Sequence, residues 1–445
     1  MTGRNLNVLT AAEAAAAIAR GDITSEALVS DCLARIEVRD DEVQAWAHLD
    51  RDYALEQARG ADERRRSGQG VGVLNGVPVA IKDIIDTSDM PTENGSAYYK
   101  GRRPVADAAC VAALRSAGAV ILGKTETTEL ATLTPSRTRN PLDLARSPGG
   151  SSAGSAAAVA DLMVPLALGT QTAGSVIRPA SYCGIYALKP TFGLISRRGV
   201  LPQSHTLDTL GVYGRTLEDV ALAADVLSAY DPEDEASYPR SQPRLSTMAR
   251  EPAPVPPIFA FIRTPAWDSA DERMRSAFAE LVEALGARVQ EIDIASLADV
   301  IEWQRTIQSA ENAHYYGPLL RRAPDTLSDE LRVRLEAGMK VGVQDYLTAI
   351  RSREAAYAIV AELLSDYTAI LTPAAPGPAP RLSEGITGSP VFNGLWNYLG
   401  CPCVSLPLME ADGLPIGVQL VGARRDDGRL LRTARALVTE IEQMG

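Results

Sequence analysis

The sequence predicts an α/β fold with a mixed, mostly parallel central sheet that helices cover on both faces. From about residue 71, short β-branched or apolar runs alternate with stretches of helical character. Such alternation is typical of a parallel sheet, because each crossover between parallel strands lays a helix on one face. The runs expected to form strands are residues 77–81, 120–122, 164–168, 258–262, 289–294 and 369–371.

The chain of 445 residues has the length of one large α/β domain or of about two or three average domains. Residues 1–66 are expected to form a helical segment packed on the core, opened by a capping-box pattern at Thr10 and Glu13. Residues 67–445 are expected to form the main domain. Its motif-rich part, Pro-rich surface connection and second half lie at about 71–230, 230–257 and 258–445.

Composition and charge limit the partners and the compartment that the protein can be expected to have. The chain is 46% hydrophobic and 22% charged, with a formal net charge of −12. We expect no nucleic-acid partner, because neutralising phosphates needs a basic face. Five cysteines, an odd number spread thinly over the chain, indicate a reducing compartment rather than a disulfide-stapled domain. No signal-peptide core or run of ~18 apolar residues is visible. The expectation is a cytoplasmic protein without a membrane partner, and a homodimer is left open.

Residues 118–125 match the phosphate-binding pattern G-x-x-x-x-G-K-[ST] letter for letter. In a true phosphate loop a strand precedes the first glycine, and the residues between the glycines wrap the phosphates. Here those residues are Ala, Val, Ile and Leu, which have the character of a buried strand, and Lys124 follows them. A P-loop nucleotide-binding protein is therefore an alternative that the context disfavours.

Residues 150–154 match G-x-S-x-G, the nucleophile elbow of α/β-hydrolases, with Ser152 at the centre. Such an elbow follows a strand and is served by a later acid and a later histidine. Residues 147–149 read Ser-Pro-Gly, which is a loop, and only His205 and His314 follow. The context disfavours this elbow as well.

Two serine-bearing loops follow one another, at residues 147–155 and 169–175, and each leads into a helical segment. Loops of this kind present hydroxyls and backbone amides at a helix N-terminus, where developing negative charge is stabilised. A flexible linker is the alternative for the first loop, but the Ala-rich run at 155–158 that follows it is a strong helix former.

Further motifs accompany the two loops along residues 5–435. They are the segments 74–83, 183–184, 188–191, 196–200, 207–208 and 413–419. With these motifs the sequence resembles the amidase signature family. Ser151 follows Lys82 by 69 residues and Ser175 follows Ser151 by 24, which is similar to malonamidase-type members. The resemblance implies one large domain of the amidase signature fold.

The resemblance implies an amidohydrolase with Ser175 as nucleophile, Ser151 as proton bridge and Lys82 as base. A serine hydroxyl needs a base before it can attack, and the three histidines of the chain are isolated. Lys82 closes the apolar run 77–81, where desolvation would lower its pKa towards ~7 to 8. The adjacent Asp83 would act in the opposite direction unless its carboxylate points elsewhere.

The resemblance also implies a cis peptide bond between Gly150 and Ser151, with Ser152 as a neighbouring hydrogen-bond support. The carbonyl oxygen of the substrate would be held by the backbone amides of Thr172, Ala173, Gly174 and Ser175. Members of the family usually have Gly-Gly before the nucleophile. Ala173 departs from this pattern and is tolerable only if its φ is negative.

No cofactor and no metal are expected, because acyl transfer to serine needs neither. Cys401 and Cys403 have the wrong spacing for a zinc site and no paired histidine. We expect them to pack in the core.

Arg178 stands three residues after Ser175, an arrangement similar to that of malonamidase-type members. An arginine at this position could pair with a substrate carboxylate, which would favour a small acid amide such as malonamate. The alternative is an internal ion pair with an Asp or Glu, since buried arginines have anionic partners.

Other acyl substrates stay open, because the same oxyanion site serves any acyl group. They are aryl amides, carbamates and esters, and the pocket walls that select among them are expected to include residues 303–316. A further alternative is the amidase subunit of a tRNA-dependent amidotransferase, which the acidic balance of the chain disfavours.

Overall fold

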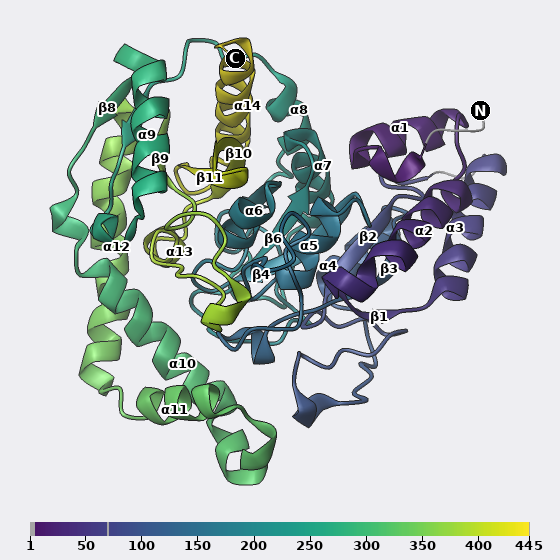
Figure 1. Ribbon diagram of the computed structural model, residues 1–445, viewed down its shortest axis with the longest axis horizontal. Coiled ribbons are helices and arrows are strands. Elements are labelled where there is room, and N and C mark those ends of the chain that lie inside the picture. Colours follow the sequence, from purple (N-terminus) through teal and green to yellow (C-terminus); the bar gives the residue numbers. More distant parts are fainter. Residues whose placement is uncertain (1–4, 69–70, 445) are drawn as a thin grey trace.

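An eleven-stranded mixed sheet runs through the protein, whose computed structural model describes residues 5–68 and 71–444 (Figure 1). The strands are β1 (Trp46–Leu49), β2 (Pro78–Lys82), β3 (Val120–Thr125), β4 (Leu166–Gln171), β5 (Tyr186–Lys189), β6 (Thr209–Gly214), β7 (Phe259–Phe261), β8 (Val289–Glu291), β9 (Ala369–Pro373), β10 (Cys403–Ala411) and β11 (Leu414–Val421). Their order is β1-β3-β2-β4-β6-β5-β10-β11-β9-β7-β8. The β10–β11 pair thus joins the strands of the first half, through β5, to those of the second half, through β9.

The prediction of an α/β fold is confirmed, but the prediction of a mostly parallel sheet is wrong. Six of the strand pairings in the described part of the chain are antiparallel and four are parallel. The six predicted runs correspond to β2, β3, β4, β7, β8 and β9, and they make all four parallel pairings. Every antiparallel pairing involves one of the five strands that the sequence prediction omitted. Those five are β1, β5, β6, β10 and β11.

The β10–β11 hairpin carried a signal that the sequence prediction overlooked. Asp412 and Gly413 connect the two strands, with φ of 54° and 73°. A hairpin turn with positive φ at both central residues favours Asp-Gly. This dipeptide between two apolar runs therefore predicts the hairpin.

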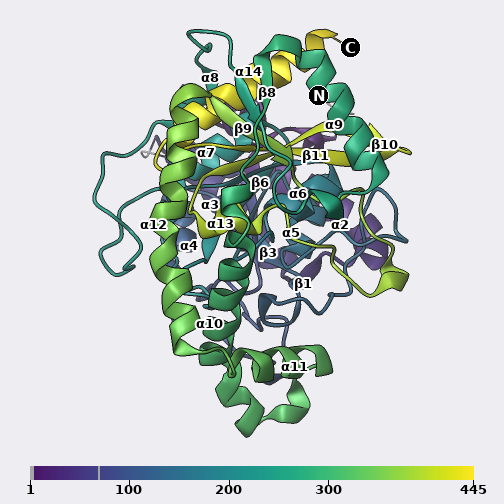
Figure 2. The same ribbon diagram turned by 90° about the vertical axis from the view of Figure 1, so that its left-hand side faces the viewer.

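Helices cover both faces of the sheet, as predicted (Figures 1 and 2). They are α1 (Ala11–Arg20), α2 (Ser25–Val43), α3 (Arg51–Arg66), α4 (Ala109–Ser116), α5 (Ala153–Ala160), α6 (Ile177–Cys183), α7 (Leu217–Leu227), α8 (Leu245–Arg250), α9 (Glu272–Leu285), α10 (Val300–Arg322), α11 (Asp329–Gly338), α12 (Val343–Asp366), α13 (Gly394–Tyr398) and α14 (Asp427–Met444). None of these described helices is long and apolar enough to cross a membrane.

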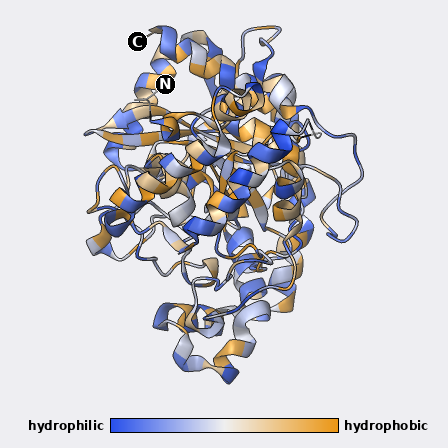
Figure 3. Ribbon diagram, turned by 90° about the vertical axis from the view of Figure 1, so that its right-hand side faces the viewer, coloured by the Kyte–Doolittle hydropathy of each residue, from blue (hydrophilic) through white to orange (hydrophobic). Residues whose placement is uncertain are grey.

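Strand β2 shows why the sheet needs both layers. Val79 and Ile81 lie in a hydrophobic cluster with residues of α4, α7 and α14, whereas Ala80 between them lies in a cluster with residues of α2 and α5. Side chains that alternate with a period of two reach opposite faces of a sheet. Hydrophobic and hydrophilic residues alternate along the outer helices in Figure 3, as expected for helices with one buried side.

The N-terminal segment contains α1, α2 and α3 and also strand β1, which pairs antiparallel with β3 at the edge of the sheet. The capping box is confirmed: Glu13 N donates to Thr10 Oγ1 at 3.2 Å, and Thr10 N donates to the Glu13 carboxylate at 3.0 Å. The helical prediction for this segment missed β1, because four residues between two helices are too few to show a period.

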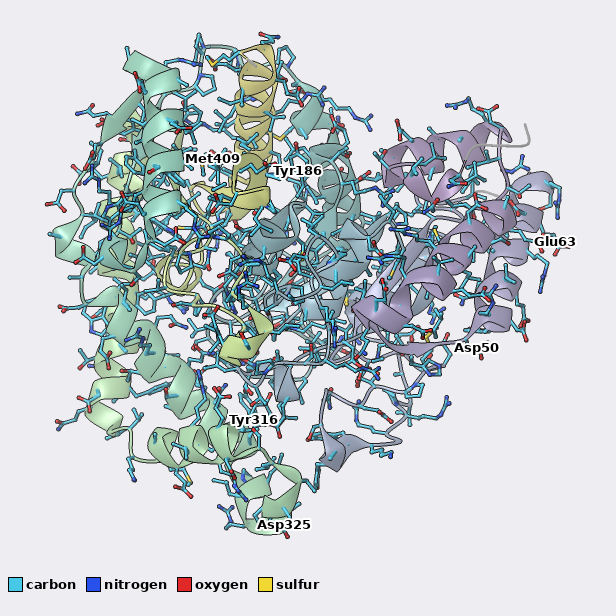
Figure 4. The ribbon with its side chains drawn as sticks, viewed as in Figure 1. Asp50, Glu63, Tyr186, Tyr316, Asp325 and Met409 are labelled. Carbon is cyan, nitrogen blue, oxygen red and sulfur yellow. The ribbon has the colours of Figure 1, made fainter. Side chains whose placement is uncertain are left out.

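Helices α10 and α11 form an arm that extends from the body, with Tyr316 near its junction with the body and Asp325 near its tip (Figures 1 and 4). Leu331 and Leu335 of α11 lie in a small hydrophobic cluster with Tyr316 and Leu130. Leu130 belongs to the short 3-10 helix Glu129–Ala131 of the body. The arm is therefore anchored to the loop that follows β3.

Candidate active site

Lys82 is the last residue of β2, and its side chain is completely buried. Its Nζ donates hydrogen bonds to Ser151 Oγ at 2.7 Å and to Thr170 Oγ1 at 2.8 Å. Burial lowers the pKa of Lys82 well below its ordinary value, and the carboxylate of Asp208 acts in the opposite direction. Because burial removes hydration from the charged amine, it favours the neutral form that a base requires.

The carboxylate of Asp83 is engaged elsewhere. Asp83 Oδ1 lies 3.2 Å from Lys124 Nζ, and Asp83 Oδ2 accepts a 3.0 Å hydrogen bond from the backbone N–H of Glu93. Lys124 also donates to the carbonyl oxygen of Pro91 at 3.1 Å. Lys124 is therefore a buried structural residue on β3, and three of the four residues between the two glycines of the phosphate-loop pattern belong to that strand. The nucleotide-binding alternative is wrong on this geometry.

The first serine loop contacts Lys82 directly through Ser151 and holds its other partner, Thr170, through Ser152. The peptide bond between Gly150 and Ser151 is cis, as the resemblance implies. Ser152 Oγ donates to the carbonyl oxygen of Thr170 and accepts from the N–H of Thr170, both at 3.3 Å. Ser152 is completely buried, unlike the exposed serine of a nucleophile elbow. It fixes the backbone of the residue whose hydroxyl accepts from Lys82.

The second serine loop follows β4 and is fixed by hydrogen bonds of the Gln171 and Tyr213 side chains. Gln171 Oε1 accepts hydrogen bonds from the backbone N–H groups of Val176 at 2.9 Å and Ile177 at 3.0 Å. Tyr213 Oη donates to the carbonyl oxygen of Ser175 at 3.0 Å. Ser175 is half-buried between fully buried neighbours and lines a cavity.

The segment before Ser175 is held from outside the loop. Thr172 Oγ1 donates to Asp208 Oδ1 at 2.5 Å, and the carbonyl oxygen of Thr172 accepts from Asn397 Nδ2 at 2.7 Å. Asp208 Oδ2 accepts from the backbone N–H groups of Gln203 at 2.8 Å and Ser204 at 2.9 Å. Burial raises the pKa of Asp208, and its hydrogen bonds with Thr172, Ser204 and Gln203 act in the opposite direction.

Ala173 and Gly174 fit this segment for different reasons. Ala173 is not among the described non-glycine residues with positive φ, so an alanine is tolerated where the family usually has glycine. A Cβ on Gly174 would lie 2.5 Å from Asn393 Oδ1 and 2.7 Å from Pro390 Cβ. No side chain fits there, because real Cβ contacts of that length do not occur.

Arg178 lies on α6, is fully buried and lines the same cavity. Its Nη2 donates to the carbonyl oxygen of Gly150 at 2.6 Å. Its Nη1 donates to Thr387 Oγ1 at 3.0 Å and to the carbonyl oxygens of Thr387 and Gly388. No Asp or Glu of residues 5–68 and 71–444 forms an ion pair with it, so the expected alternative of an internal ion pair is wrong for these residues. Burial lowers the pKa of Arg178 from its ordinary value.

The cavity has a volume of about 340 Å³, within the range of ~300 to 1,000 Å³ of small-molecule sites. The segment 173–175 and Arg178 form one part of its wall, and residues 389–391 form another. The arm contributes side chains of α10 and α11 between residues 301 and 337, which overlaps the expected wall at 303–316. Lys82 and Ser151 are buried and are not among the described residues of this wall.

Sequence reasoning missed three residues that organise the site: Thr170, Gln171 and Asp208. All three lie inside motifs on which the resemblance rests, but a motif alone does not predict which of its side chains form hydrogen bonds within the site. Cys401 and Cys403 pack in a hydrophobic cluster with residues of α12 and α13, as expected.

The comparisons with known proteins agree with this geometry. The family model described as Amidase matches residues 27–431. The chain belongs to the amidase signature family. Among solved structures, the peptide amidase from Stenotrophomonas maltophilia has a TM-score of 0.84 at 28% identity, covering 98% of this chain and 97% of the other. A 6-aminohexanoate cyclic dimer hydrolase has a TM-score of 0.86 at 26% identity, covering 98% of each chain.

Other members of the amidase signature family are similar along nearly their whole length. One subunit of the glutamyl-tRNA(Gln) amidotransferase of Chloroflexus aurantiacus is 34% identical over 97% of this chain and 96% of its own. A further solved chain has a TM-score of 0.90 at 30% identity, covering 97% of this chain and 98% of its own. It comes from a vestigial protein complex that reveals the evolutionary origins of an s-triazine catabolic enzyme. The protein is a carbon–nitrogen hydrolase of this family.

Proposed function

We propose that this protein hydrolyses small linear amides through an acyl-enzyme on Ser175, with Ser151 relaying protons to and from Lys82. The observation that carries the proposal is the 2.7 Å hydrogen bond between Lys82 Nζ and Ser151 Oγ inside a fully buried site. A lysine is a usable base only where burial keeps it neutral, and burial is the main cause of its lowered pKa.

The proposed reaction has two halves. Ser175 Oγ attacks the amide carbonyl carbon while its proton passes through Ser151 Oγ to Lys82 Nζ. The C–N bond then breaks, the amine leaves with that proton returned through Ser151, and an ester on Ser175 remains. Water attacks the ester by the same relay, which releases the carboxylic acid and restores Ser175.

The backbone amides of residues 172–175 are proposed to hold the oxyanion that forms in both halves. The hydrogen bonds of Gln171, Tyr213 and Thr172 support this role, because they fix the loop before the substrate arrives. Each donor of such a site is worth roughly 3 to 4 kcal/mol of transition-state stabilisation in other hydrolases.

Acidic amides are the proposed preference within this class. Arg178 supports it, because it is a buried cation that lines the cavity of Ser175 without an anionic partner among the described residues. A substrate carboxylate would supply the missing charge. Malonamate is a small amide of this kind, and aryl amides, carbamates and esters are the competing substrates.

The amidase subunit of a tRNA-dependent amidotransferase is the second candidate, favoured by the 34% identity to one such subunit over nearly the whole chain. Both candidates use the same hydrolytic step. They differ in whether the isolated chain turns over free amides efficiently. We expect the chain alone to hydrolyse a small acidic amide faster than glutamine, whereas the reverse order would favour the amidotransferase candidate.

The experiment compares the wild type with Ser175→Ala on malonamate, an anilide, an aryl carbamate and an ester. Hydroxylamine is added in a parallel series, because an acyl-enzyme partitions between water and hydroxylamine to give a hydroxamate. We expect hydroxamate from the wild type and none from Ser175→Ala. Wild-type activity in the alanine variant would contradict the assignment of the nucleophile.

A further inference from the structure

Residues 202–207 form an irregular segment that leads to Asp208 and strand β6, and side chains from later helices hold it. Four of its backbone carbonyl oxygens accept hydrogen bonds: that of Pro202 from Tyr316 Oη at 2.7 Å, that of Gln203 from Asn312 Nδ2 at 2.8 Å, that of Thr206 from Arg353 Nη2 at 2.7 Å and that of Leu207 from Asn397 Nδ2 at 2.9 Å. The four donors belong to α10, α12 and α13, at least 109 residues further along the chain. The segment therefore takes its position from the second half of the protein.

The carboxylate of Glu311 on α10 makes the most contacts with this segment, and the residue is only 7% exposed. Glu311 Oε2 accepts hydrogen bonds from Ser204 Oγ and from the backbone N–H of Thr206, the latter at 3.2 Å. Glu311 Oε1 accepts from Thr206 Oγ1 at 2.8 Å and from Tyr346 Oη of α12 at 2.7 Å. A carboxylate offers about four acceptor sites, so these four donors occupy it fully.

Glu311 is a buried acidic residue that forms no ion pair with the described residues. Burial, and then the hydrogen bond to Glu311, raise the pKa of Tyr346, which keeps its hydroxyl a donor. Burial lowers the pKa of Arg353, and the charge of Glu311 acts in the opposite direction. Asn312 and Tyr316 on the same helix hold the segment with uncharged groups, so a simple tie does not need a carboxylate. Hydrogen bonds to an ionised acceptor are shorter and roughly twice as strong, which indicates that the position of the segment matters at Glu311.

Ser204 connects Glu311 to Asp208. Its hydroxyl donates to Glu311 Oε2, and its backbone N–H donates to Asp208 Oδ2 at 2.9 Å. Asp208 Oδ1 accepts in turn from Thr172 Oγ1 at 2.5 Å, and Thr172 begins the segment proposed to hold the oxyanion. Of the charged groups in the described chain, Asp208 is the one that acts on the pKa of Lys82. Hydrogen bonds therefore link the arm, step by step, to the segment that carries the proposed nucleophile.

We propose that Glu311 is a positioning residue for amide hydrolysis, acting through Ser204 on Asp208. By fixing Ser204, Glu311 keeps the Asp208 carboxylate in place, and that carboxylate positions Thr172 and acts on Lys82. This inference rests on the proposed function, because it takes Lys82 as the base. Glu311 is not among the described residues of the cavity wall, so it acts through other residues rather than on the substrate. Loss of its charge should therefore lower kcat more than it changes KM.

The first test is Glu311→Gln, which keeps the shape of the side chain and removes its charge. With a neutral amide as substrate, we expect kcat to fall about 10-fold or more, as for a lost hydrogen bond to a charged group, and KM to change less than about 2-fold. The acid limb of kcat/KM should shift to lower pH, because a displaced Asp208 carboxylate raises the pKa of Lys82 less. Ser204→Ala removes only the hydroxyl donor of this link and should give the same changes at smaller size. It tests the inference even if Glu311→Gln does not fold.

A double variant separates positioning from general support of the fold. Combined with Asp208→Asn, Glu311→Gln should cause little further loss of kcat and no further shift of the limb, because both changes break the same chain of contacts. Glu129→Gln is the matched control, since the Glu129 carboxylate accepts from the N–H of Ser328 at 3.1 Å and also ties the arm to the body. It should leave the limb in place, and its effect on kcat should add to that of Asp208→Asn. An unchanged limb in Glu311→Gln, or a loss that adds to that of Asp208→Asn, overturns the inference.

Hydrogen–deuterium exchange gives a readout that does not depend on activity. The peptide of residues 202–210 contains the backbone N–H groups that donate to Asp208 and Glu311. We expect them to exchange about 10-fold faster or more in Glu311→Gln, and at the wild-type rate in Glu129→Gln. Unchanged exchange in Glu311→Gln overturns the inference. Failure of the proposed function appears separately, as hydrolysis by Ser175→Ala, whereas failure of this inference alone leaves Ser175→Ala inactive.

Discussion

Arg178 Nη2 donates a 2.6 Å hydrogen bond to the carbonyl oxygen of Gly150, the residue before Ser151. The helix that follows the proposed nucleophile is thereby tied to the loop of the proposed proton bridge. Through Nη1 the same guanidinium also holds the segment at Thr387 and Gly388. One side chain therefore links helix α6 to two other segments of the chain.

Arg178→Leu is expected to impair turnover of all substrates, because it removes the donor from three carbonyl oxygens, two of them buried. We expect a loss of about 2 to 4 kcal/mol in the free energy of unfolding, measured by chemical denaturation, and lower kcat/KM for all amides, with the larger fall for acidic amides. A loss confined to acidic amides, with unchanged stability, would show that Arg178 acts on the substrate carboxylate alone.

The pH dependence of kcat/KM for a neutral amide should report the protonation of Lys82. Only the neutral amine accepts a proton, so activity is lost as the pH falls through the pKa of Lys82 in the folded protein. Because burial lowers that pKa, the acid limb should lie well below pH ~10, near which an ordinary lysine titrates. An acid limb near pH ~10 would mean that Lys82 is solvated in the active enzyme.

Asp208→Asn should shift the acid limb of the kcat/KM profile to lower pH. The carboxylate of Asp208 raises the pKa of Lys82, so removing its charge lowers that pKa and extends activity to lower pH. Turnover should fall at the same time, because a neutral amide loses the charge-assisted hydrogen bonds that the carboxylate accepts from Thr172, Gln203 and Ser204. Asp231→Asn, which breaks an ion pair with Arg198, is the control and should leave the limb in place. An upward shift of the limb in Asp208→Asn would contradict the electrostatic role of this carboxylate.

Thr170→Val should weaken the base without removing it. The substitution deletes the hydroxyl that lies 2.8 Å from Lys82 Nζ but keeps the branched shape in the core. We expect kcat to fall about 10- to 100-fold, whereas Thr170→Ser, which keeps the hydroxyl, should retain most of the activity. Equal rates for the two variants would show that the contact with Lys82 is dispensable.

The sequence predicted the parts of the protein that local patterns encode. Apolar runs identified the parallel strands, and of the three predicted catalytic residues the structure joins Lys82 and Ser151 by a hydrogen bond. The antiparallel strands were missed, since runs such as Thr209–Gly214 contain glycine and polar ends and gain their strand state from neighbours on the sheet. The direction of the Asp83 carboxylate and the carbonyl partners of Arg178 depend on residues far away in the chain, which no local pattern specifies.

The β10–β11 hairpin has a consequence for the order in which the enzyme becomes active during synthesis. Gln419 Nε2 on β11 donates to the carbonyl oxygen of Phe392 at 3.0 Å, and its Oε1 accepts from Asn393, the residue that closely abuts Gly174. Strand β10 also pairs antiparallel with β5. A nascent chain that already contains both serines and Lys82 should therefore remain inactive until residues 403–421 have left the ribosome. Translational stalling before that point should yield no amidase activity.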